Sequence, residues 1–229
     1  MGKRVTLVGV GHVFDISGQV AGLIEYTSPD AIALELDRKR LQALLCPSRP
    51  RQQPFFYTLL ATAQQRIAKK YGVTTGAEMK AALSAAQRRH IGVICIDMDV
   101  HLLFEKLWKR MSFKKKISLA LGGLLSFGIR KKRVEAEVAS FEADPVSYLE
   151  QLDAHFPEMA SVFIDERNRF MAEQIEKALS IYEHLVVFVG EGHLSGLESL
   201  LKEKTSVTSI HLRQLREDSW RQQLTERYP

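Results

Sequence analysis

Short, uninterrupted runs of apolar and β-branched residues recur along the chain, and they constrain its fold more than any other feature. Four of them have the length of one strand: Val5–Val10, Ala31–Leu36, Ile91–Ile96 and Leu185–Gly190. Strands without a polar side are buried on both faces, which is typical of parallel sheets covered by helices. A fifth run, Ser206–Leu212, is a candidate last strand before a polar tail.

The intervals between these runs carry helical periodicity. We expect helices over Ile16–Tyr26 and Asp37–Leu45, two more across Phe55–Arg89, and one over Pro157–Ser180. The alternation predicts an α/β fold with a central sheet, mostly parallel or mixed, flanked by helices. The stretch from about 101 to 184 contains no clear strand, which indicates a helical insertion. At 229 residues, the chain 1–229 fits one domain.

Composition places the chain among soluble globular proteins. It is 45% hydrophobic and 26% charged, without low-complexity tracts, so it is expected to fold unaided. The two cysteines, Cys46 and Cys95, are far apart in sequence and predict neither a disulfide framework nor a metal pair. We therefore expect a cytoplasmic protein.

The net charge of +5 is concentrated around one apolar stretch, Ile117–Ile129. This stretch is shorter than the roughly 20 residues of a membrane-spanning helix. Because basic residues flank it on both sides, the segment 109–133 is a candidate for peripheral contact with a membrane, although solvated helix faces show the same pattern. No aromatic residues interleave with the basic ones, so no nucleic acid is expected. The sequence does not indicate an oligomeric state.

Two of the strand runs end in the same motif, Gly-x-Gly-His, at Gly9–His12 and at Gly190–His193. A dinucleotide-binding turn would need a third small residue where the first copy has Phe14, and neither copy has the Gly-Lys-Ser/Thr of a P-loop. Phosphate binding is therefore disfavoured. The glycines are better explained by a tight turn with positive φ and by close approach of the backbone.

Histidines and carboxylates follow the predicted strands, and the carboxyl ends of parallel strands share one edge of a sheet. Imidazole with carboxylate suits zinc, manganese or cobalt, and an ion with an open position can activate water. The same groups can act without metal as a general acid–base pair. In a purely structural interpretation the acidic residues cap helices, and Glu166 and Arg167 pair across a helix interface. The residues concerned at the strand ends are His12, Glu35, Asp37, Asp97, Asp99 and His193.

At these residues the chain resembles the TraB family, also called the PrgY or pheromone-shutdown family. This family is related to the TIKI metalloproteases and, more distantly, to the erythromycin esterase and ChaN-like group. The resemblance spans nearly the whole chain in the expected order. It is carried by GVGH at Gly9–His12, SPDAIALELDRKRLQALL at Ser28–Leu45, GAEMKAAL at Gly76–Leu83, ICIDMDVHLLFEKLWKRMS at Ile94–Ser112, DERNRFMAEQI at Asp165–Ile175 and VGEGHLSGL at Val189–Leu197.

The resemblance implies a divalent-metal site held by His12, Glu35 and His193. It also marks Glu78, Glu166, Arg40 and Arg167 as residues of the family's motif blocks. We expect Glu166 or Glu78 to take a proton from bound water, and Arg167 or Arg40 to stabilise an oxyanion.

Two positions depart from the family pattern. Val10 stands where a threonine is usual, and Met98 replaces the arginine of an Asp-Arg-Asp signature.

The resemblance as a whole leads to the hypothesis of a metal-dependent, peptidase-like hydrolase acting on peptide or amide bonds. The alternative is a non-catalytic protein that binds a peptide or small molecule, or a membrane-associated regulator.

Overall fold

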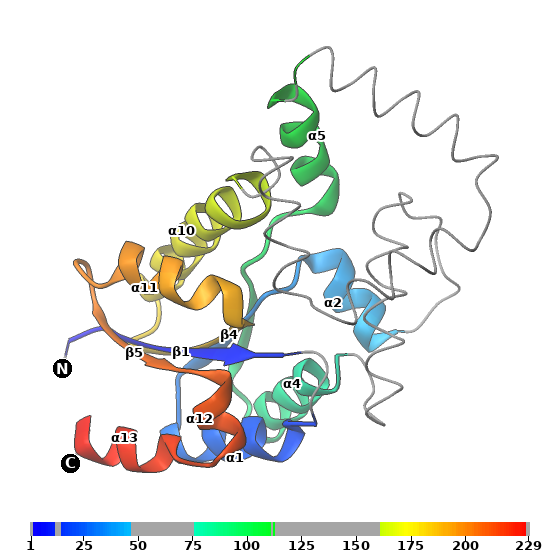
Figure 1. Ribbon diagram of the computed structural model, residues 1–229. Helices are drawn as coiled ribbons and strands as arrows, with labels where there is room; N and C mark the ends of the chain where they lie inside the picture. Colours follow the sequence, from blue (N-terminus) through cyan, green and yellow to red (C-terminus); the bar gives the residue numbers. More distant parts are fainter. Residues whose placement is uncertain (1, 12–14, 47–75, 111, 113–160, 228–229) are drawn as a thin grey trace.

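A five-stranded, wholly parallel sheet forms the centre of the protein (Figure 1). This computed structural model describes residues 2–11, 15–46, 76–110, 112 and 161–227. The strand order is β3-β2-β4-β1-β5, so the predicted α/β class is confirmed. The strands are β1 (Arg4–Val10), β2 (Ala31–Leu34), β3 (Gly92–Cys95), β4 (His184–Gly190) and β5 (Ser206–Ile210).

Helices cover both faces of the sheet (Figure 1). One face carries α1 (Ser17–Thr27), α4 (Ala77–Arg89), α12 (Leu212–Arg216) and α13 (Trp220–Arg227). The other carries α10 (Arg167–Leu179) and α11 (Leu194–Leu201). Two helices, α2 (Arg38–Leu45) and α5 (Val100–Arg110), begin just beyond the carboxyl ends of β2 and β3.

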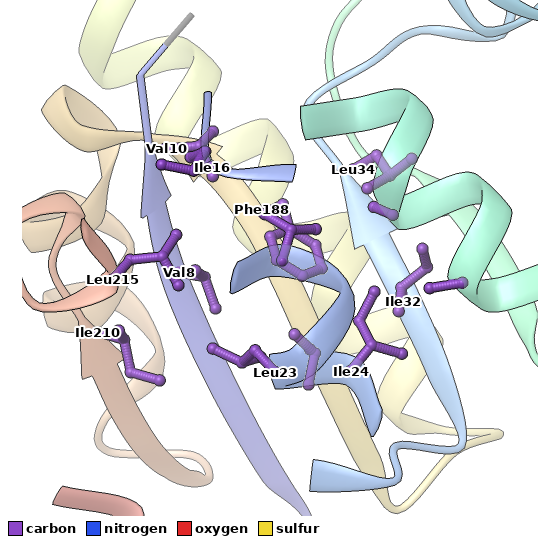
Figure 2. Packing of buried hydrophobic residues seen from close by; sticks show 14 of the residues in the cluster. Val8, Val10, Ile16, Leu23, Ile24, Ile32, Leu34, Phe188, Ile210 and Leu215 are labelled. Atoms are coloured by element: carbon purple, nitrogen blue, oxygen red, sulfur yellow. The ribbon is translucent and has the colours of Figure 1, made fainter. Parts of the chain in front are cut away.

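The central strands are buried on both sides, as their apolar runs predict. Every residue of β2 is buried, as are all of β1 and β4 except one end residue each. On the α1 face, Val8, Ile32 and Phe188 from three adjacent strands pack against Leu23 and Ile24 of α1 (Figure 2). The residues of β3 are only half-buried, because β3 is one of the two edge strands of the sheet.

The structure corrects two of the sequence expectations. The helix predicted over Pro157–Ser180 includes a π-helical turn, η1 (Ser161–Glu166), before α10 begins at Arg167. The predicted last strand ends at Ile210, and the polar tail beyond it folds into α12 and α13, whose Trp220 and Leu224 are fully buried.

Parts of the predicted insertion and of the Phe55–Arg89 helices lie outside the described residues. The segment 109–133 does so as well, apart from Lys109, Arg110 and Ser112. None of the helices in the described part of the chain combines the length and apolar character that crossing a membrane requires.

A buried histidine at the amino end of β4 makes stability depend on pH. Burial of His184, with repulsion from Arg4, lowers the pKa of its imidazole to about 4, and Asp30 opposes this shift only in part. Between about pH 6.5 and pH 4 the unfolded chain therefore binds a proton at this position that the folded chain refuses. We expect the free energy of unfolding to fall by up to about 3 kcal/mol across that interval, with no contribution above it and no further loss below it.

Urea denaturation at a series of pH values, on the native chain and on His184→Phe, measures this loss. The native chain should lose about 3 kcal/mol more than the variant on acidification. Parallel pH curves for the two proteins would contradict the assignment to His184.

Candidate functional site

The carboxyl edge of the sheet collects the polar residues that the sequence places after the strands. Glu35 follows β2, Asp97 follows β3, and His193 ends the short 3-10 helix η2 (Glu191–His193) that follows β4. Helix α10 packs on one face of the sheet and precedes β4. Its first residues, Arg167 and Asn168, therefore lie at the same edge, where they contact Glu35 and His193. Five side chains from four segments thus meet there.

Glu35 is fixed by two groups. One carboxylate oxygen, Oε2, accepts a hydrogen bond from the backbone N–H of Gly190 at 2.6 Å, and the other, Oε1, forms an ion pair with Arg167. The contact with Gly190 follows from the pairing of β2 with β4, which places Glu35 just beyond the Leu34–Phe188 pair, whereas Arg167 reaches Glu35 from the start of α10. The alternative that Glu35 caps the next helix is wrong, because Asp37 is the N-cap of α2.

Two arginines hold Asp97 at the centre of a charge network. Arg167 donates two hydrogen bonds to the Asp97 carboxylate, both at 2.9 Å, and Arg40 forms a further ion pair with it. Burial alone would raise the pKa of Asp97, but the two guanidinium groups outweigh burial and lower it. Arg40 also binds Asp37 at 2.9 Å. In this network of described residues, the three carboxylates of Glu35, Asp37 and Asp97 outnumber the two guanidinium groups by one negative charge.

Arg167 owes its stable charge to the same neighbours. Burial opposes the charged guanidinium, but the carboxylates of Glu35 and Asp97 outweigh it and raise the pKa of Arg167. For Arg40, likewise, Asp97 and Asp37 overcome burial and raise its pKa. Both arginines therefore stay charged at every physiological pH.

His193 is buried between Glu35 and α10. Its Nδ1 lies 2.8 Å from Oδ1 of Asn168, and its Nε2 lies 3.6 Å from Oε1 of Glu35. Burial lowers the pKa of the imidazole, and Arg167 adds to that effect, whereas Glu35 opposes it. The ring is therefore neutral near pH 7 and keeps a lone pair on one nitrogen, as a metal ligand or a general base requires.

The other predicted site residues are placed differently. His12 lies outside the described residues, although β1 and β4 are neighbours and their last residues, Val10 and Gly190, pair. Glu166 forms ion pairs with Lys106, at 2.5 Å, and with Arg110, both on α5. The hydrogen bond from Lys106 is the main cause of a lowered pKa at Glu166.

Glu78 is fully buried in the first turn of α4, on the opposite face of the sheet from α10. The residue before this helix, Gly76, lies against Leu44 of α2. Because α2 follows β2, the first turn of α4 reaches the carboxyl edge too. Glu78 therefore approaches the edge from the face opposite to Arg167.

Gly9 and Gly190 serve close approach of the backbone rather than positive φ. None of Gly9, Gly190 and Gly192 has a positive φ, so that part of the prediction is wrong for these three glycines. A Cβ at Gly9 would lie 2.0 Å from Oε2 of Glu191 and 3.3 Å from the backbone nitrogen of Leu212. A Cβ at Gly190 would lie 3.3 Å from the Glu35 carboxylate.

Sequence reasoning missed the contribution of Asn168. Its signal is the helical period of α10, in which Asn168 is buried together with Met171, Ala172 and Ile175. A polar residue on the apolar side of a helix needs a hydrogen-bonding partner, and here that partner is His193.

Comparison with known proteins identifies the family of the chain. The sequence profile of the TraB/PrgY/gumN family matches residues 1–206. The uncharacterized protein MJ1365 of Methanocaldococcus jannaschii is 28% identical over 225 residues, and the alignment covers 92% of this chain and 56% of that protein. The chain thus spans about half the length of this relative. Since the profile extends from the first glycine-histidine motif past the second, the chain belongs to the TraB/PrgY/gumN family.

Proposed function

We propose that the chain is a divalent-metal-dependent hydrolase of the peptidase-like type, acting on peptide or amide bonds at the carboxyl edge of the sheet. The observation that supports this proposal best is the meeting of Glu35 Oε1 and His193 Nε2 at 3.6 Å. This separation is too long for a hydrogen bond. It is close to the ~3.4 Å between two ligands that each lie about 2.1 Å from one tetrahedral ion.

The chemistry of the donors also fits an ion. A neutral imidazole and a carboxylate suit zinc, manganese or cobalt, and the excess negative charge of the network favours a cation. No group of three His, Cys, Asp or Glu side chains that could hold a metal is found among the described residues. The third protein ligand in this proposal is His12, which comes two residues after Val10, the residue that pairs with Gly190.

A bound ion would supply a polarised substrate carbonyl and a water of lowered pKa. The chain's own residues would position the reactants. The pairing of Glu166 with Lys106 lowers its pKa and makes its carboxylate a poor proton acceptor. We therefore assign proton transfer to Glu78. Arg40, whose side chain is 38% exposed, is better placed than Arg167 to reach a substrate oxyanion.

One observation favours the second candidate function, ligand binding without turnover. Both oxygens of Glu35 are already bound by groups of the protein, the Arg167 guanidinium and the Gly190 N–H, so this carboxylate is held in place without an ion at Oε1. In this alternative the edge would hold a peptide or small molecule, and Arg40 would bind an acidic group on it.

Metal titration with stability and activity readouts separates the two candidates. Protein purified without chelator should bind one zinc, manganese or cobalt ion per chain. His193→Ala and Glu35→Gln should weaken that binding at least ~100-fold, because each removes a direct ligand. His211→Ala is the matched control, since His211 is an exposed imidazole at the same edge that pairs with Glu191 at 2.6 Å.

Cleavage of a broad peptide library is the second measurement. The proposal expects turnover that EDTA abolishes and that His193→Ala lacks. Binding of a peptide without cleavage would favour the alternative. No stoichiometric ion, or equal metal affinity in His193→Ala and in His211→Ala, would overturn the metal site.

A further inference from the structure

Asn168 places a polar amide where the fold otherwise buries apolar groups. Only 4% of Asn168 and 5% of His193 is exposed, and the two side chains meet at 2.8 Å. The contact joins α10 to the end of η2, which leads directly into α11, and α10 and α11 pack on the same face of the sheet. Inside a protein such a hydrogen bond is costly to lose, because a buried donor or acceptor would remain unpaired.

Gly196 of α11 makes the space for this amide. A Cβ on Gly196 would lie 2.2 Å from Nδ2 and 3.1 Å from Cγ of Asn168, well inside contact distance. The amide therefore occupies the volume that any side chain at position 196 would need. With Nδ2 against Gly196, the oxygen Oδ1 is the end of the amide that faces His193.

We propose that Asn168 is a positioning residue, which holds the neutral imidazole of His193 with its hydrogen on Nδ1 and so directs the lone pair of Nε2 at the carboxylate of Glu35. Gly196 supports this role, because it keeps the amide of Asn168 in place. The tautomer follows from the hydrogen bonds alone. Only its use, to offer Nε2 to a divalent ion, rests on the function proposed above.

The two distances at the ring distinguish this tautomer from the other one. The hydrogen-bonded contact is at Nδ1, at 2.8 Å, whereas the 3.6 Å between Nε2 and Glu35 exceeds hydrogen-bond length. The Glu35 oxygen nearest to Nε2 already pairs with Arg167. Among the described residues, a hydrogen on Nε2 would thus have no good acceptor, while one on Nδ1 has Asn168.

Nuclear magnetic resonance of the imidazole nitrogens tests the proposal directly. Spectra are recorded on EDTA-treated protein at about pH 8, above the ordinary pKa of histidine. In the native chain, the Nδ1 resonance of His193 should lie in the protonated range and that of Nε2 in the unprotonated range. The opposite pattern in the native chain would overturn the proposal.

Substitutions then separate the role of each residue. Asn168→Leu removes the acceptor, so the hydrogen should move to Nε2, and both resonances should exchange ranges. Asn168→Asp keeps an acceptor and should keep a hydrogen on Nδ1. An unchanged spectrum of Asn168→Leu would contradict the proposal.

Gly196→Ala provides a test that alters neither partner of the hydrogen bond. Its methyl group should displace the amide of Asn168 and change the His193 spectrum as Asn168→Leu does. Alanine is the better helix former, so the variant should remain folded. Gly18→Ala is the matched control, since a Cβ at Gly18, also in a helix, would meet no atom within 4 Å. A changed spectrum in Gly18→Ala, or an unchanged one in Gly196→Ala, would contradict the role of Gly196.

Zinc affinity gives a readout that depends on the proposed function. Partners that orient a ligating histidine typically contribute 10–100-fold to metal affinity, so Asn168→Leu and Gly196→Ala should bind zinc about 10–100-fold more weakly. If the tautomer shifts as expected but the native chain binds no zinc, the positioning role stands and the metal-dependent function fails. If the native chain binds zinc but the tautomer is the opposite one, the reverse holds.

Discussion

Replacing Arg167 with methionine should lower the free energy of unfolding by about 3 to 5 kcal/mol. The substitution keeps most of the side-chain volume but removes the charge that Glu35 and Asp97 share. Only 15% of the Arg167 side chain is exposed, and only 3% of that of Asp97. The loss is large because two carboxylates with little access to water would lose a common partner, and water cannot fully replace it.

The neighbours of Arg167 decide where the loss falls within that range. Asp97 retains its ion pair with Arg40 and a hydrogen bond from the Met98 N–H, so it remains paired in part. Glu35 retains the Gly190 N–H. Without Arg167, the pKa of His193 should also rise, because the guanidinium contributes to its lowered value.

Guanidinium chloride denaturation measures the effect of Arg167→Met. The matched control is Lys204→Met, which breaks an exposed ion pair with Glu176 at 2.7 Å and should cost less than about 1 kcal/mol. The double variant Arg167→Met with Glu35→Gln should recover part of the loss, since it removes one of the two orphaned charges. Equal losses for Arg167→Met and Lys204→Met would show that the network adds no more stability than a surface pair.

The strands were predictable because their physical signal is local. A run of four to seven apolar and β-branched residues is typical of a buried strand, and β1, β2 and β4 are buried in that way. The second and third predicted strands extended too far at their carboxyl ends. In the structure each strand ends before its acidic residue, Glu35 or Asp97, whose carboxylate then joins the charge network with Arg167.

The meeting of Glu35 with His193 could be predicted only as far as one edge of the sheet. Sequence patterns imply that parallel strands share an edge, but they do not give the strand order. It is the adjacency of β2 and β4 that brings the Glu35 carboxylate to the Gly190 N–H and within 3.6 Å of the His193 ring. Had β2 lain at the far edge of the sheet, the same motifs would be present without this contact.

Arg167 and Arg40 show a different limit. Both were predicted as site residues, but as groups for an oxyanion, whereas the structure shows them paired with carboxylates of the protein. An arginine's motif position does not show how much of its charge is already compensated. That depends on which acidic residues the fold brings near, here Asp97, which follows β3 and lies 70 residues from Arg167 in the chain.

The C-terminal tail was expected to be polar because most of its residues are charged or amides. The two buried side chains of α13, Trp220 and Leu224, are four residues apart and lie on the same side of that helix. This two-residue signal is too short to detect without the structure. These residues nevertheless matter for stability, because Trp220 belongs to the core cluster that includes Val8 and Ile24.

Replacing Trp220 with alanine should therefore cost about 3 to 5 kcal/mol of the free energy of unfolding, because it leaves a large cavity between the C-terminal helices and α1. The ring is fully buried, stacks edge-on with Tyr26 at 5.5 Å between centroids, and carries the Arg221 guanidinium over it at 4.5 Å. Trp220→Phe should cost far less, about 1.5 kcal/mol or below. It also removes the indole N–H, which has no hydrogen-bond partner among the described residues.

Urea denaturation of both variants, with Ile181→Ala as control, tests this prediction. Ile181 is a large apolar residue with 77% of its surface exposed, so its loss should change stability by less than about 0.5 kcal/mol. A large loss with an unchanged m value would show that the C-terminal helices unfold together with the sheet. A small loss accompanied by a lower m value would contradict that view, because it would mean that α12 and α13 detach while the sheet and the Glu35–His193 edge stay folded.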